Sequence, residues 1–313
     1  MVKGKLWIVL NPIAGKGNAA KQYPKIERFL LESGRDFEIL LTKGSGDAPQ
    51  PAGALELVRN LPLTEGDAVV AAGGDGTCNE VVNGLFARSP PPPPPLIGVL
   101  PVGRGNDFSS ALGIPGDVEK ALEILVAGKI RPLDAGFVKG GRFPDGRYFV
   151  NVVGIGFDTK VVFEAAKLKI KSDISYALGA LINVIRYDPS PVLRIRYNDN
   201  EMTLPTLIVS FANGRRMGGI FHMSPDALLD DGLLDFCAAE HRSSRFKLLN
   251  IVYRYTRATH TSLEGMHTGR ASHFHLEALE GGMAAHCDGE TVCENGKELE
   301  ITCIPGALRV IGT

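Results

Sequence analysis

The chain has 313 residues, 44% of them hydrophobic and 22% charged, which is ordinary for a soluble globular protein and sufficient for two domains with separate cores. Its 34 basic and 35 acidic residues give no overall field that would attract a nucleic acid, so nucleic acid is not an expected partner. The five cysteines form no C-x-x-C pair and no apolar run is long enough to span a bilayer, which together indicate a cytoplasmic protein with reduced thiols.

The first part of the chain alternates between two kinds of pattern. Short apolar runs, typical of buried strands, alternate with longer segments of helical spacing. Strands are expected at residues 5–10, 37–41, 67–71, 96–100 and 131–134, and helices at 19–33, 48–61, 77–86 and 117–127. This alternation predicts a parallel sheet with helices on both faces, so residues 1–134 are predicted to form an α/β domain.

The loop after the first strand runs from Asn11 to Gly17 and is rich in glycine. Residues 15–20 match G-x-G-x-x-A, the dinucleotide fingerprint, but the second strand ends in Thr42-Lys43-Gly44 instead of the acidic residue that would hold a ribose. The P-loop pattern fails as well, because its glycine spacing and its Ser/Thr after the lysine are missing. For Lys16, a solvated loop lysine and a contact to a phosphate remain equally good interpretations.

A second glycine-rich turn, Gly73-Gly74-Asp75-Gly76-Thr77, follows the third strand. Glycines allow a ligand to approach the main chain closely. Thr77 and Glu80 match the T-x-x-E capping box, which predicts a helix that begins at Thr77 and directs its free amides into the loop, as in many anion sites. A carboxylate in such a loop repels a phosphate unless a cation lies between them, and the Mg²⁺ of a nucleoside triphosphate supplies one for Asp75.

The pattern changes from residue 148 onward, where strand-like runs follow one another directly. They lie at 148–153, 192–197, 203–213, 233–239, 272–279, 299–304 and 307–311, interrupted by helical segments at 159–187 and 243–255. This order predicts a second, antiparallel domain over residues 135–313, with the last strand as a candidate to return to the first domain.

The turn at Gly73–Thr77 resembles the signature of the diacylglycerol and sphingosine kinases, which NAD kinases and, more distantly, phosphofructokinases share. Further segments match the lipid kinases in the family's order: Asn11-Pro12-x-x-Gly15, Pro101–Phe108, Gly154–Asp158, Leu228–Asp235 and Asp288-Gly289-Glu290. The matches are spread over nearly the whole chain and make it similar to the bacterial branch. The resemblance implies a nucleotide-binding first domain like that of the NAD kinases and phosphofructokinases, and a lipid-binding β-sandwich as the second.

The resemblance also implies which residues contact the nucleotide. They are Asn11, Gly15, Lys16, Thr42, Gly73, Gly74, Gly76, Thr77, Asn79, Arg104 and Asn106. Arg104 departs from the family, which has a threonine there; the arginine either grips phosphates bidentately, which we favour, or points away. Asp107 would help Asp75 to hold the Mg²⁺–phosphate assembly or would orient the acceptor hydroxyl, although helix capping is its structural alternative.

Two acidic segments of the second half match the family's metal site and its catalytic carboxylate. A structural magnesium implied by the resemblance would be held by Asp231 and the main-chain oxygens of Leu228 and Leu233; an Asp-Asp-Gly turn is the equally good alternative. Glu290 would be the base that takes the proton of the attacking hydroxyl, with Asp75 as the competing assignment. Asp288-Gly289 also fits a hairpin turn.

These expectations describe an ATP-dependent, Mg²⁺-requiring lipid kinase. Its default acceptor is diacylglycerol, which gives phosphatidic acid, and it would meet the lipid by peripheral contact at the inner face of a membrane; a homodimer stays open. Asp158 is a candidate contact to the lipid head group, with helix capping as an at least equally good alternative. Residues 167–171 are a candidate membrane-docking edge, for which solvated lysines at a helix end are the commoner explanation. The alternatives are an NAD kinase and a catalytically silent nucleotide-binding protein, the latter suggested by Arg104 and by the proline run at 90–95.

Overall fold

The computed structural model describes residues 4–42, 53–88, 94–156, 159, 191–241 and 245–313. The chain forms two compact units. The first comprises Met1–Ala135, Leu229–Asp231 and Pro305–Thr313, and the second comprises Gly136–Leu228 and Gly232–Ile304.

The first unit is built on a parallel sheet in the order β2–β1–β3–β4–β17. Its strands are β1 (Leu6–Leu10), β2 (Phe37–Leu41), β3 (Ala68–Gly73), β4 (Leu96–Pro101) and the last residues of β17 (Glu298–Ile311). Arg309 and Val310 of β17 pair with Leu96 and Ile97 of β4. Every residue of β1, β3 and β4 is buried, as expected for parallel strands that are covered on both faces.

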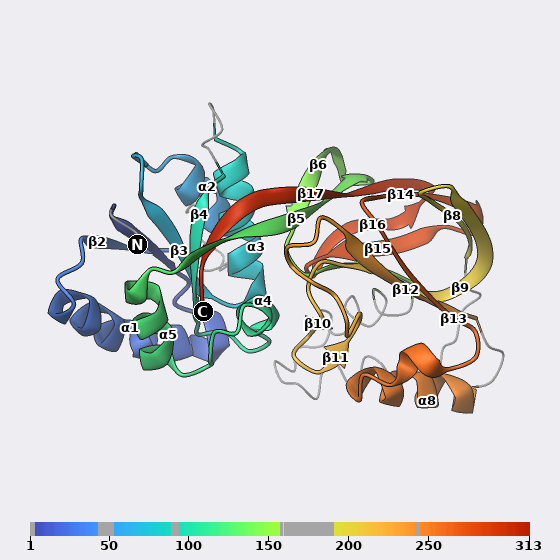
Figure 1. The fold of residues 1–313 in the computed structure, drawn as a ribbon, viewed down its shortest axis with the longest axis horizontal. Helices are drawn as coiled ribbons and strands as arrows, with labels where there is room; N and C mark the ends of the chain where they lie inside the picture. The colour runs from blue at the N-terminus through green and yellow to red at the C-terminus, as the bar shows by residue number, and fades with distance from the viewer. Residues whose placement is uncertain (1–3, 43–52, 89–93, 157–158, 160–190, 242–244) are drawn as a thin grey trace. The chain divides into compact units, whose positions relative to one another are not determined.

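Helices cover the two faces of this sheet (Figure 1). On one face, α1 (Ala14–Glu32) packs against α5 (Val118–Ala127), and on the other α2 (Ala54–Arg59) packs against α3 (Asp75–Phe86); the short α4 (Asp107–Ala111) follows β4. Residues 15–17 within α1 have positive φ, so its regular part begins at about residue 18. The predicted parallel α/β architecture is therefore confirmed for the first part of the chain.

The second unit is antiparallel, and its longest inner strand passes from one sheet to another. The first half of β9 (Asn200–Ala212) pairs with β8 (Val192–Tyr197), which continues through β14 (His273–Glu280) to the start of β17. Its second half pairs with β7 (Val152–Gly156) and β12 (Leu234–Glu240). The remaining strands are β5 (Ile130–Gly140), β6 (Phe143–Phe149), β13 (Met266–Ala271), β15 (Met283–Cys287) and β16 (Glu290–Gly296).

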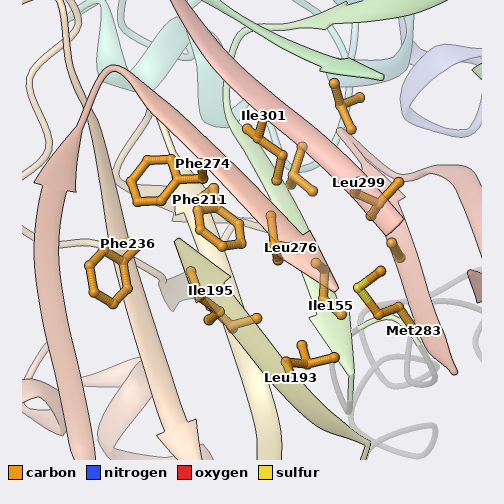
Figure 2. Close-up of a cluster of buried hydrophobic side chains, with 14 of the residues drawn as sticks. Ile155, Leu193, Ile195, Phe211, Phe236, Phe274, Leu276, Met283, Leu299 and Ile301 are labelled. Carbon is orange, nitrogen blue, oxygen red and sulfur yellow. The ribbon is translucent and has the colours of Figure 1, made fainter. Parts of the chain in front are cut away.

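A hydrophobic core lies between these two sheets (Figure 2). Phe274 of β14 packs against Phe211 of β9 with ring centroids 4.8 Å apart and against Phe236 of β12 at 5.7 Å. Aliphatic side chains of β8, β14 and β17 and of β7 and β15 complete it, among them Ile195, Leu276, Leu299, Ile155 and Met283. The core has the two-sided composition of a β-sandwich, in which the inner faces of both sheets interdigitate.

A second apolar cluster lies on the other face of β9 and β12. There Ile208 and Ala239 pack against Leu248, Ile251 and Tyr255 of α8 (Arg245–Thr256). The hairpin of β10 (Arg216–Met217) and β11 (Phe221–His222) and the short 3₁₀ helix η1 (His260–Ser262) lie in the same part of the chain. Near the end of β9, Ile208 and Ala212 belong to this second cluster and Val209 and Phe211 to the first core, so the two faces of the strand serve different cores.

Candidate active site

The predicted nucleotide-binding residues gather at one edge of the first unit. Three loops leave the sheet there, after the carboxyl ends of β1, β3 and β4, and Thr42 follows β2 at the same edge. In open parallel sheets this is the edge at which ligands bind. Asn11, Gly15 and Lys16 belong to the first loop; the remaining predicted residues belong to the second loop with α3 and to the third loop, namely Gly73, Gly74, Gly76, Thr77, Asn79, Arg104 and Asn106.

The three loops are joined through their main chains. Asn11 N donates to Ala72 O at 3.0 Å, and Gly103 N donates to Gly73 O at 3.0 Å. Gly103 lies so close to Gly74 that a Cβ on Gly103 would clash with the Gly74 Cα and nitrogen. A glycine is required at this contact because backbone meets backbone, so the second and third loops are held in fixed register.

Asn11 links the first loop to the start of α3. Its Nδ2 donates to Thr77 Oγ1 at 3.3 Å, while its Oδ1 accepts from Ile13 N at 3.2 Å. Thr77 is buried, and the hydrogen bond from Asn11 directs its hydroxyl at the first loop.

The expected capping box of Thr77 and Glu80 is wrong. Helix α3 begins two residues earlier, at Asp75, with Gly74 as its N-cap and no side-chain cap. The Thr77 hydroxyl is engaged by Asn11, and Glu80 Oε2 accepts from Ala54 N at 2.6 Å, which caps the neighbouring α2. An N-terminus that carries no side-chain cap leaves amide groups for an anionic ligand.

Asp75 connects the second loop to the third. Its Oδ1 accepts from Phe108 N at 3.0 Å. The amides of Asn106 and Asp107 also favour the charged form of the Asp75 carboxylate. Burial raises the pKa of Asp75, while these amide hydrogen bonds at the start of α4 act in the opposite direction. The carboxylate is thus placed at a helix N-terminus, where a negative charge is stabilised.

The first and third loops contain residues with a strained backbone and residues with exposed side chains. Lys16 has φ 60° and Asn106 has φ 50°, a left-handed conformation that is costly for residues with a side chain and is enriched at functional sites. Asn106 Nδ2 donates to Gly103 O at 3.3 Å, which fixes the tip of the third loop. The side chains of Lys16 and Arg104 are both exposed and are therefore free to meet phosphates from solvent.

Asn79 and Asp107 lie deeper than the other predicted residues. The Asn79 side chain is fully buried and its Oδ1 accepts from Asn83 Nδ2 at 3.2 Å, which directs this amide into helix α3. Asp107 is 4% exposed in the first turn of α4. Asp75 and Asp107 both carry the hard carboxylate oxygens that Mg²⁺ prefers, so the residue types at this edge fit a magnesium–nucleotide complex.

The Asp288-Gly289 pair forms the two-residue turn between β15 and β16 in the second unit. Asp288 has φ 47° and Gly289 has φ 89°, as a type I′ hairpin requires. The Asp288 carboxylate accepts from the amides of Val150, Asn151 and Val152 at 2.9, 3.1 and 2.9 Å. Glu290 is the exposed first residue of β16.

The predicted structural-magnesium residues lie in a segment that changes unit twice. Asp231 is exposed and belongs to the first unit, whereas Leu228 and Leu233 belong to the second. Within the described parts of the chain, no group of three or more His, Cys, Asp or Glu side chains is arranged to hold a metal ion.

Several expectations fall on residues that lie outside the described ranges: Asp158, Lys43, Gly44, the edge at 167–171 and most of the proline run. In the part of the chain that the structure describes, no helix is both long enough and apolar enough to cross a membrane.

Comparison with known proteins identifies the family. Residues 5–138 match the family model described as the diacylglycerol kinase catalytic domain, and residues 151–312 match that of the YegS C-terminal NAD kinase beta sandwich-like domain. A diacylglycerol kinase of Bacillus subtilis is 34% identical over 233 residues, which cover 73% of this chain and 71% of that protein. The chain belongs to the diacylglycerol kinase family of lipid kinases.

Other relatives agree with this lipid-kinase assignment. A diacylglycerol kinase of Staphylococcus aureus is 33% identical over 256 residues, 81% of this chain and 76% of that protein. A YegS-like lipid kinase of Chromohalobacter salexigens is 29% identical over 251 residues, 80% and 75% of the two chains. The solved structure of a diacylglycerol kinase from Bacillus anthracis has a TM-score of 0.69 at 22% identity over 99% of this chain and 97% of that one, which shows a shared fold.

Proposed function

We propose that this lipid kinase transfers the γ-phosphate of ATP to the free hydroxyl of diacylglycerol and so forms phosphatidic acid. The proposal is carried by one observation: the loops with Lys16, Asp75 and Arg104 are joined at a single sheet edge in a chain of the lipid-kinase family. Several relatives are named diacylglycerol kinases, which favours this acceptor over sphingoid bases, ceramide and phosphatidylglycerol.

The nucleotide would bind at the edge loops. The uncapped start of α3 and the left-handed segment at residues 15–17 would donate main-chain amides to the phosphates, while Lys16 and Arg104 would neutralise their charge. Mg²⁺ held by Asp75 and Asp107 would offset the remaining phosphate charge and align the γ-phosphate for transfer. Thr42 and Asn11 would contact the nucleoside part or the outer phosphates.

Glu290 would act as the general base. Its carboxylate would take the proton from the acceptor hydroxyl while the new oxygen–phosphorus bond forms and the bond between the γ-phosphorus and the β,γ-bridging oxygen breaks, leaving ADP. Glu290 and Asp75 belong to different units, so the proposal requires both to approach the same phosphate during turnover.

The acceptor determines where the reaction would take place. Diacylglycerol resides in a bilayer, so we propose peripheral contact with the inner face of the membrane, and a structural magnesium at Asp231 with the main-chain oxygens of Leu228 and Leu233. Association of two copies of this chain into a homodimer is also a prediction.

The proposal is tested by incubating the purified chain with ATP labelled at the γ-phosphate, Mg²⁺, and diacylglycerol in mixed micelles. Glu290→Gln should lower kcat by roughly 10²- to 10⁴-fold with ATP binding retained, because a lost general base costs about that much. Glu294→Gln is the matched control, since Glu294 is exposed on the same strand and pairs with Arg142 at 2.8 Å. Transfer of the labelled phosphate to NAD⁺ instead of lipid would support an NAD kinase. Transfer to no acceptor would support a catalytically silent nucleotide-binding protein.

A further inference from the structure

The main chain at residues 150–152 forms a buried corner between β6 and β7. β6 ends at Phe149 and β7 begins at Val152, and Val150, Asn151 and Val152 are at most 4% exposed. Buried amide groups at such a corner need acceptors, because an unpaired buried N–H is costly. The three amides find theirs in one side chain, the Asp288 carboxylate.

The corner is also held from its other side. Asn213 Nδ2 donates to Val150 O at 3.1 Å, and the amides of Asn213 and Gly214 donate to Asn151 O at 2.8 and 2.9 Å. Asp288 therefore binds to a part of the second unit that is fixed by the end of β9.

The hydrogen bonds of the Asp288 carboxylate to residues 150–152 are not required by the hairpin turn itself. An asparagine before glycine satisfies a type I′ turn equally well, since only the left-handed backbone is needed. What asparagine cannot supply is a second acceptor oxygen and the negative charge that strengthens bonds to amides. Asp288 N in addition donates to Val152 O at 3.0 Å, so main chain and side chain bind the same corner.

This anchor matters for Glu290 because the hairpin itself is irregular. The pairing of β15 with β16 shifts register twice, between Met283 and Ala285 and between Ala285 and His286. After the second shift only two regular pairs, His286 with Thr291 and Cys287 with Glu290, lead into the turn, so the β15–β16 ladder holds the turn over a short stretch. Glu290 is only two residues beyond Asp288 and pairs with Cys287 at the end of the ladder.

We propose that Asp288 is a positioning residue for phosphoryl transfer: its carboxylate fastens the β15–β16 turn to the 150–152 corner and thereby sets where the Glu290 carboxylate lies. The inference rests on the proposed role of Glu290 as the base. Asp288 itself takes no proton and contacts no reactant. Displacing a base by about an ångström is enough to cost a large part of its effect.

The test compares Asp288→Asn with Asn198→Asp in the intact chain. Asn198 also has positive φ, lies in the turn between β8 and β9, and donates to Arg270 O at 3.2 Å, so its replacement removes a turn hydrogen bond away from Glu290. We expect Asp288→Asn to lower kcat at least tenfold with the KM for ATP within twofold, and Asn198→Asp to leave both unchanged. Amide exchange of the peptide 283–296 should accelerate in Asp288→Asn only.

A double-mutant cycle shows whether the effect passes through Glu290. In a Glu290→Gln background, Asp288→Asn should have little further effect on kcat. The inference is overturned if kcat of Asp288→Asn is within twofold of the wild type, if the two losses multiply, or if exchange of the turn is unchanged. If Asp288→Asn does not fold, the same measurements are made with Asp288→Glu. This variant keeps the negative charge but moves it by the length of one methylene group.

Failure of the proposed function gives a different pattern. If Glu290→Gln keeps wild-type kcat, Glu290 is not the base and the role assigned to Asp288 falls with it. If the wild type phosphorylates no lipid, amide exchange alone decides whether Asp288 holds the turn. If Glu290→Gln is inactive while Asp288→Asn is fully active, only the present inference is wrong.

Discussion

A buried histidine of the second unit is expected to make stability depend on pH. His260 is fully buried in η1, and its ring stacks on Tyr255 with centroids 3.8 Å apart and an angle of 13°. Burial lowers the pKa of His260 to about 4, the charge of His222 lowers it further, and main-chain groups of Met223 and Arg254 oppose the shift. The folded state therefore keeps this ring neutral at a pH at which an unfolded chain would protonate it.

The sign and size follow from linkage between protonation and folding. The pKa of His260 falls from 6.5 to about 4 on folding, so between these values the unfolded state binds more protons and stability decreases as the pH falls. The full shift corresponds to about 3 kcal/mol, of which about 2 kcal/mol should be lost between pH 7.5 and pH 5. Lowered pKa values of His222 and His241 add to this loss, whereas the raised pKa of Asp75 acts against it.

The assay is urea denaturation of the wild type and of His260→Phe at several pH values from 7.5 to 5. Phenylalanine keeps the stacking on Tyr255 but cannot take a proton, so the stability of the variant should change by about 2 kcal/mol less over this range. His273→Asn is the control, because His273 is exposed on β14. Equal pH slopes in the wild type and in His260→Phe would refute the reasoning.

Three further outcomes are expected. Glu80→Ala should destabilise the first unit by about 1 kcal/mol, measured as a lower Tm, because it removes the cap that Glu80 gives to Ala54 N of α2. Gly103→Ala should abolish ATP binding in equilibrium dialysis, since its Cβ would clash with Gly74, whereas Gly116→Ala, outside the three edge loops, should keep ATP binding because its Cβ meets no atom within 4 Å. Chelation of Mg²⁺ by EDTA should stop phosphate transfer, and added Mg²⁺ should restore it; transfer that continues in EDTA contradicts the assigned role of Asp75.

The parallel half of the chain was predictable from its sequence because its signals are local. Apolar runs of five or six residues, each followed by a glycine-rich loop, identify β1, β3 and β4 and also the edge at which the loops meet. The antiparallel half was predictable in kind but not in detail. The sequence pattern does not predict β15, because Met-Ala-Ala-His-Cys carries no β-branched residue, nor its partner β16, because the hairpin is bulged.

Contacts between distant residues could not be predicted from the sequence. The capping box at Thr77 and Glu80 satisfies every local rule, yet both side chains bind other segments, Asn11 and Ala54. A local sequence pattern indicates which hydrogen bonds the start of a helix can make. It does not indicate whether a residue from a distant segment takes the side chain as its hydrogen-bond partner instead. Asp288 is a similar case, because its acceptor role depends on amides 136 to 138 residues away.

The hydrogen bonds of the two candidate bases favour Glu290 over Asp75. Asp75 Oδ1 already accepts from Phe108 N, and that bond joins the loop after β3 to the start of α4. Protonation of Asp75 would weaken the bond at the moment when the loops must hold the nucleotide, although its raised pKa would by itself suit a base. Glu290 is exposed at the start of β16, and its neighbour Asp288 carries the structural hydrogen bonds instead. A carboxylate that must accept and release a proton in every cycle acts best when another residue holds the chain in place.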